Sequence, residues 1–105
     1  MSDYLGDVKR YSSNANEAAV KGITNYLGAG VLAQRDASLV SCTDPAELGR
    51  VRDNFATKKL GLTDGDAVDA ALQKVCEQMK EDRNKSRVTF YYLLAEATGT
   101  LGALT

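Results

Sequence analysis

The sequence predicts an all-α fold: a compact single-domain bundle of four to five helices that takes in residues 1–105. Every strongly periodic segment has helical spacing, and each carries an apolar stripe that must be buried against another helix. Capping residues and glycines mark the ends of these segments. The length of 105 residues matches a single domain with one core.

The clearest helical pattern covers residues 66–82. Its larger apolar residues recur with helical spacing and form a single stripe, made of Val68, Leu72, Val75, Cys76 and Met79. Just before it, Thr63, Asp64 and Asp66 offer side-chain oxygens to the unpaired amides of a first helical turn. The pattern therefore predicts a helix that begins close to Asp66.

Residues 44–60 are predicted to form another helix. Asp44 is placed to cap it, Pro45 stands at the first helical position, and Glu47 occupies the reciprocal position of a capping box. Its apolar stripe is narrow and consists of Leu48, Val51 and Phe55. Gly61 follows, and glycine readily adopts the left-handed conformation that ends many helices. We therefore expect this helix to end near residue 60.

Two further helices are predicted in the N-terminal part of the chain. Residues 16–27 carry apolar residues at spacings of three and four, with Asn14 or Asn16 as the cap. Residues 2–11 can form a shorter helix. Residues 29–42 show no readable pattern, so their conformation is not predicted.

Residues 88–95 are apolar or aromatic almost throughout, and periodicity alone cannot separate a buried strand from a buried helix. No second strand candidate is present to pair with its backbone, whereas a cap at Ser86 and continuation through Glu96 and Ala97 suit a helix. Apolar residues then cover most of its circumference. We expect either the central helix of the bundle or a helix with a second face in an oligomer interface.

Composition and charge favour a cytoplasmic globular protein. Thirteen basic and fourteen acidic residues leave a net charge of −1, so no overall field draws the chain to nucleic acid or to anionic lipid. The first residues are acidic where a signal peptide is basic, and no apolar run reaches the length of a membrane span, so no membrane association is expected. Cys42 and Cys76 form no CxxC pair and no disulfide framework, and we expect reduced, buried thiols.

Two patterns that resemble ligand sites are better explained by helix ends. Residues 28–33 match the GxGxxA dinucleotide fingerprint, but that turn must follow a buried strand, and the preceding residues have helical spacing. A helix that stops at Gly28, followed by a short second helix, is the better interpretation. Asp64, Asp66 and Asp69 lack the spacing of a calcium loop, and capping and an exposed face explain them. No cofactor and no metal ligand are predicted.

Catalytic residues are not predicted either. The chain contains no histidine, which removes the commonest general base and excludes the familiar triads. Cys42 lies just before a predicted helix start that would favour a thiolate, but the neighbouring Asp44 opposes this effect. A carboxylate, lysine or cysteine enzyme has no positive support in the sequence, so an enzyme is the least favoured class.

Three stretches of the chain resemble a known family. They are residues 36–42 with the sequence DASLVSC, the residues RV, NF and KKLGL within 50–62, and residues 89–96 with the sequence TFYYLLAE. All are similar to a small bacterial family, the domain of unknown function 2853. The resemblance covers residues 36–96 and implies a bacterial cytosolic protein, but it supplies no activity, substrate or catalytic residue.

The favoured hypothesis is a small non-enzymatic protein-interaction module that can form a homo-oligomer. It is motivated by the absence of catalytic motifs and by the apolar helix at 88–97, which one small bundle does not obviously cover. Leu94 is expected in the core. Tyr91 or Tyr92 is expected to face a partner, because a phenol keeps its polar tip in water while its ring is buried.

The alternative hypothesis is a helical nucleic-acid-binding domain, which is less favoured because the basic residues are diluted by acidic ones. Two local basic runs would have to converge on one face to contact several phosphates. The candidate contacts are Arg50, Lys58, Lys59, Lys85 and Arg87.

Overall fold

A computed structural model of the chain describes residues 4–12, 15–33, 39–81 and 85–104, and gives only the backbone of residues 29–33. Its elements follow the order α1 (Tyr4–Lys9), α2 (Glu17–Ala33), β1 (Leu39–Val40), α3 (Pro45–Arg50), η1 (Val51–Thr57), α4 (Gly65–Gln78), β2 (Lys85–Ser86), α5 (Arg87–Thr98) and η2 (Leu101–Leu104). The fold is an all-α bundle, as the sequence predicts. None of its described helices is both long and apolar enough to cross a membrane.

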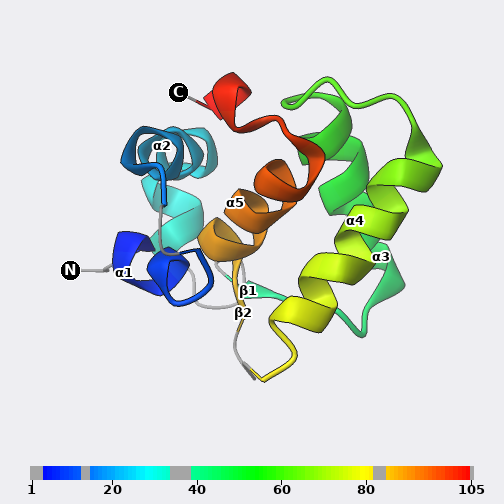
Figure 1. The fold of residues 1–105 in the computed structure, drawn as a ribbon, viewed down its shortest axis with the longest axis horizontal. Coiled ribbons are helices and arrows are strands. Elements are labelled where there is room, and N and C mark those ends of the chain that lie inside the picture. The colour runs from blue at the N-terminus through cyan, green and yellow to red at the C-terminus, as the bar shows by residue number, and fades with distance from the viewer. Residues whose placement is uncertain (1–3, 13–14, 34–38, 82–84, 105) are drawn as a thin grey trace.

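Helix α5 lies at the centre of the bundle. Helices α1 and α2 lie on one side of it, and α3 and α4 on the other (Figure 1). All eight residues from Val88 to Ala95 are buried, including Leu94. The prediction of a central helix at this position is therefore confirmed, and its continuous apolar character is explained because neighbours cover every side of it.

Helix α2 begins where the sequence predicts and bends where a stop was expected. The Asn16 side chain accepts a hydrogen bond from the amide of Ala19 at 3.2 Å, which caps the helix. Gly28 has φ 81° and ψ 157°, so two helical pieces meet there at a kink. The GxGxxA stretch thus follows a helix rather than a strand, as the sequence indicates.

The C-terminal turn η2 packs against α2, and the backbones approach closely because Gly22 has no side chain. A Cβ atom at Gly22 would lie 1.7 Å from the carbonyl oxygen of Leu104. Leu104 itself is buried. Gly22 therefore permits the last described turn of the chain to close the bundle.

The helix predicted for residues 44–60 is correct at its start but not along its length. Asp44 caps α3 by accepting from the Ala46 amide at 3.0 Å. After Arg50 the chain widens into the π-helix η1, and the amide of Leu60 donates to Phe55 five residues back at 3.0 Å. Val51, Phe55 and Ala56 of this wider segment are all buried.

Helix α4 has the predicted cap and the predicted buried stripe. One oxygen of Asp64, Oδ1, accepts from the amides of Asp66 and Ala67 at 3.1 and 3.2 Å. The helix ends at Gln78, four residues before the predicted end at Asp82, which lies outside the described residues. Val68, Leu72, Val75 and Met79 are buried against α5 and η1.

A two-residue strand pair was not expected from the sequence. Strands β1 and β2 pair antiparallel, with Leu39 opposite Ser86 and Val40 opposite Lys85. Ser86 occupies the N-cap position of α5, but its side chain makes no capping hydrogen bond. This short pair fixes the segment that leads into α3 beside the start of α5.

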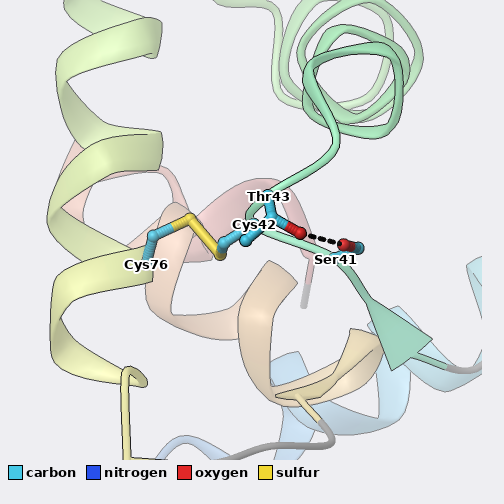
Figure 2. Close-up of a disulfide and its surroundings, with 4 residues drawn as sticks. All are labelled: Ser41, Cys42, Thr43 and Cys76. Atoms are coloured by element: carbon cyan, nitrogen blue, oxygen red, sulfur yellow. Dashed lines mark hydrogen bonds between the residues drawn. A yellow bond between two sulfur atoms is a disulfide. The ribbon is translucent and has the colours of Figure 1, made fainter.

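The expectation that both cysteines are reduced is wrong for this structure, because Cys42 and Cys76 form a disulfide (Figure 2). Cys42 lies in the segment between β1 and α3, and Cys76 lies on α4, with a Cα–Cα distance of 5.9 Å. The hydroxyls of Ser41 and Thr43 are 3.1 Å apart on either side of Cys42. The bond therefore ties the entry of α3 to α4, and both cysteines are only half-buried.

Candidate functional site

Both tyrosines predicted to face a partner lie in the core. Only 5% of Tyr91 and 1% of Tyr92 are exposed. The hydroxyl of Tyr92 accepts a hydrogen bond from the amide of Asn16 at 2.7 Å, so its polar tip is satisfied inside the fold rather than by water. The prediction of a tyrosine face for a partner is therefore wrong in the folded chain.

Tyr91 belongs to a row of aromatic rings that runs from the core to the surface. Its ring stacks on Phe55 with a centroid distance of 4.0 Å, and Phe55 in turn lies 5.6 Å from the ring of Tyr26. Tyr26 is the exposed end of this row, and its hydroxyl donates to the carbonyl oxygen of Asn54 at 3.2 Å. The row joins α2, η1 and α5.

Arg87 and Glu47 form a mostly buried ion pair for which the sequence carries no local signal. The guanidinium of Arg87 also donates to the carbonyl of Leu39 at 2.9 Å and to the hydroxyl of Tyr91 at 3.1 Å. On its other side, Glu47 accepts from Arg50 at 2.9 Å. The cluster links α3, α5 and β1, and it brings three of the predicted site residues together around one carboxylate.

The charges in this cluster fix the protonation states of its members. Burial raises the pKa of Glu47, but hydrogen bonds and charges from Arg50 and Arg87 outweigh it and hold this pKa below the ordinary value of 4.5. Burial lowers the pKa of Arg87, yet the contacts with Tyr91 and Glu47 raise it overall. Burial raises the pKa of Tyr91 despite the adjacent guanidinium. The cluster therefore carries a permanent ion pair and a neutral phenol, which suits a structural link better than proton transfer.

The predicted nucleic-acid contacts are not gathered on one element. Arg50 and Arg87 both form ion pairs with Glu47, so this carboxylate compensates part of their positive charge. Lys58 and Lys59 follow η1, where the ammonium group of Lys59 lies 5.8 Å from the ring centre of Tyr26. Lys85 lies in β2, opposite Val40. The five residues therefore come from α3, the segment after η1, β2 and the start of α5.

A groove of about 600 Å³ lies between α4 and the C-terminal end of α5. Its walls are the Gly61–Asp64 segment, the face of α4 that carries Ala67, Ala70 and Ala71, and the end of α5 at Ala97 and Thr98. Most of the lining side chains are small and apolar, and Ala67, Ala70 and Ala97 are exposed. A neighbouring hollow of about 670 Å³ shares Lys74 and Ala97 with this groove, but most of its other lining residues are charged or polar, among them Glu77, Lys80 and Glu96.

Two opposite charges lie at the groove. Asp64 caps α4 at one end, and Lys74 lies ten residues further along the same helix. Lys74 makes no ion pair with any other residue that the structure describes. The groove is thus an apolar surface with an acidic and a basic end.

Two of the three aspartates at the start of α4 have structural roles. Asp64 caps the helix, and Asp69 accepts from Arg52 of η1 at 3.3 Å. Within the described parts of the chain, no three potential metal ligands come together. The capping role predicted for Asp64 is therefore confirmed.

A family model described as a protein of unknown function, DUF2853, matches residues 3–102. The chain belongs to the DUF2853 family. The resemblance noted at residues 36–96 is thus part of a match that covers nearly the whole chain. A search of curated proteins finds no match to the chain. Because the family description assigns no activity, the function of this DUF2853 chain must be argued from its own surface.

The groove of this DUF2853 domain was missed from the sequence although a signal for it was present. Ala67, Ala70 and Ala71 share one side of the predicted helix, but only the larger apolar residues of that helix were assigned to a face. Small residues at helical spacing mark a surface that another backbone can approach closely. Their partner in the groove, Ala97, is 26 residues beyond Ala71, and only the fold brings the two together.

Proposed function

We propose that this DUF2853 protein is a non-enzymatic protein-interaction module and that the groove between α4 and α5 is its binding surface. The observation that carries this proposal is the exposure of small apolar side chains, Ala67, Ala70 and Ala97, along the groove. Small side chains let a second backbone come close, which increases the contact area per residue. Apolar hollows with a polar rim are typical of sites that bind another protein.

The occupant that fits this shape is a helix. Helix α4 has 14 residues and is therefore about 21 Å long, enough for three to four turns of a partner helix to lie alongside it. Helix-in-groove recognition relies on apolar anchors that recur every three or four residues. Asp64 and Lys74 at the two ends would orient the partner through its own charges.

The surface proposed here replaces the one expected from the sequence. The apolar circumference of α5 suggested an interface there, but the bundle itself covers Val88–Ala95. Only the last turn of α5, at Ala97 and Thr98, contributes to the groove. We therefore place the binding surface of the proposed interaction module on α4 and not on the buried tyrosines of α5.

Site-specific photo-crosslinking in living cells tests this function. A benzophenone amino acid at Ala70 should give crosslinked protein adducts, because this position faces the groove. The same amino acid at Ala46, an exposed position in the first turn of α3, serves as the matched control. Absence of any adduct from Ala70, or an equal pattern from Ala46, would contradict the proposal.

A bacterial, cytoplasmic setting is part of the same proposal. In the cytoplasm the glutathione and thioredoxin systems keep most thiols reduced, so Cys42 and Cys76 would exchange between dithiol and disulfide there. Both cysteines are half-buried rather than sealed in the core. Rapid acid quenching of cells followed by alkylation of thiols measures the reduced fraction. A chain recovered fully oxidised from unstressed cells would argue against a cytoplasmic location.

A further inference from the structure

We infer that the groove is filled by α4 of a second copy of this chain, so that the two α4 helices pack antiparallel about a two-fold axis. This inference rests on the proposed function, because it names the partner of the same groove. It is carried by the order of charges and small residues along α4.

Four residues form one stripe on the groove side of α4. Asp64, Ala67, Ala71 and Lys74 are separated by three, four and three residues. At about 100° per residue, their directions fall within an arc of about 80° around the helix axis. All four line the groove. The stripe therefore runs along the groove as a continuous row, with two alanines between an acid and a base.

The stripe is complementary to itself when it is reversed. In an antiparallel pair with its two-fold axis level with Asp69, Ala67 of one copy lies opposite Ala71 of the other. The same axis places Asp64 opposite Lys74. The pair Ala67–Ala71 and the pair Asp64–Lys74 share this axis, because Asp69 is the midpoint of both. No adjustment of the register is needed to match apolar with apolar and acid with base.

A two-fold pair makes each charge contact twice, because a symmetric interface uses the same patch on both subunits. Asp64 uses Oδ1 for the cap, and the described residues give no partner for Oδ2. Lys74 likewise has no ion-pair partner in the described parts of the chain. A parallel pair would instead place Asp64 beside Asp64 and Lys74 beside Lys74. The charges thus select the antiparallel orientation and favour a second copy over an unrelated helix.

The size of the surface sets the strength of the association. One helix of about 21 Å and the adjacent end of α5 form an interface in the small class, below about 1,200 Å² in total. Interfaces of this size are reversible at micromolar concentrations and above. We therefore expect a monomer and dimer in exchange, with the dimer fraction rising with concentration.

Sedimentation equilibrium on the full chain at several concentrations, up to about 1 mM, measures this exchange. The parent protein should show a monomer–dimer equilibrium. Lys74→Glu should weaken the association about tenfold, since it replaces two attractive contacts by two repulsive ones. The control Lys80→Glu, which alters a lysine outside the stripe, should leave the association constant unchanged.

Restoration of the charge pattern tests the register itself. Asp64→Lys combined with Lys74→Glu reverses both charges and should return the association to within about threefold of the parent. Because Asp64 is also the helix cap, Asp64→Asn with Lys74→Glu provides a second variant that keeps a capping side chain and removes the repulsion. Circular dichroism verifies that each variant is folded. If both folded combinations associate as weakly as Lys74→Glu alone, the register is wrong.

The outcomes separate this inference from the proposed function. A parent chain that remains monomeric at every concentration, while the Ala70 crosslinker captures a different protein, overturns the second copy and leaves the interaction module intact. A monomer with no adduct at Ala70 overturns both. An adduct with twice the mass of the chain, strongly reduced in Lys74→Glu and unchanged in Lys80→Glu, supports both.

Discussion

Arg87 at the start of α5 forms an ion pair with Glu47 on α3, and only 13% of each side chain is exposed. The two residues are 40 positions apart in the sequence. Loss of one partner in a pair hidden to this degree leaves the other charge without compensation. The contact between α3 and α5 therefore depends on this pair more than on the exposed pairs at the surface.

The substitution Glu47→Gln should lower the free energy of unfolding at neutral pH by about 3 kcal/mol, because the guanidinium of Arg87 loses its counter-charge in a mostly buried place. Urea denaturation followed by circular dichroism measures the change. The control Glu77→Gln removes an exposed pair with Lys80 and should cost less than about 1 kcal/mol. Equal effects of the two substitutions would mean that the Glu47 pair is as weak as a surface pair.

Glu47 should also make the free energy of unfolding depend on pH in the acidic range. The folded-state pKa of Glu47 lies below its ordinary value of 4.5, so this contribution is fully present above that pH and is lost as the pH falls through the folded-state pKa. The parent protein should therefore lose more stability than Glu47→Gln between about pH 5 and pH 3. Parallel stability curves for the two proteins over this window would contradict the assignment.

Gly22→Ala should destabilise the fold by about 1–3 kcal/mol, because the new methyl group would overlap the carbonyl oxygen of Leu104. Gly49→Ala is the matched control: a Cβ there meets no atom within 4 Å, and alanine is the better helix former. Thermal melts should therefore shift in opposite directions for the two variants. A Gly22→Ala protein that melts with or above the parent would show that η2 does not hold its position against α2.

Removal of the disulfide by Cys42→Ser with Cys76→Ser should lower the free energy of unfolding by about 3–4 kcal/mol. The bond closes a loop with a sequence separation of 34, and its loss gives the unfolded chain more conformational freedom. Treatment of the parent with a reductant should produce a shift of the same size, while the double serine variant should not respond. Identical melts of the oxidised and reduced parent would indicate that the bond contributes no stability.

Local features of the fold were predictable from the sequence because their signals lie within a few residues of one another. Asp44 and Asp64 cap helices as predicted, and Gly61 has a φ of 73°, in the left-handed region. Residues 88–95 were also correctly predicted to be helical, because the sequence offered no second strand with which they could pair. In each case the deciding residues are neighbours along the chain.

Features that depend on distant contacts were not predictable in the same way. The disulfide joins residues 34 positions apart, and no spacing rule identifies that pairing. Burial of Tyr92 depends on the amide of Asn16, 76 positions away. The groove needs α4 and the end of α5 side by side. The sequence shows which residues are apolar but not which of them the bundle covers, so the burial of Tyr91 and Tyr92 could not be read from it.

The central position of α5 also determines when the protein can fold during its synthesis. α1, α2, α3 and α4 are all made before α5, yet α1, α2 and α4 bury their apolar stripes against it. Until residues 87–98 have left the ribosome, those stripes lack the helix that they share as a packing partner. Nascent chains that lack α5 therefore expose apolar helix faces and are suited to chaperone binding. The emergence of residues 87–98 is therefore the point at which α1, α2 and α4 can first pack against their common partner.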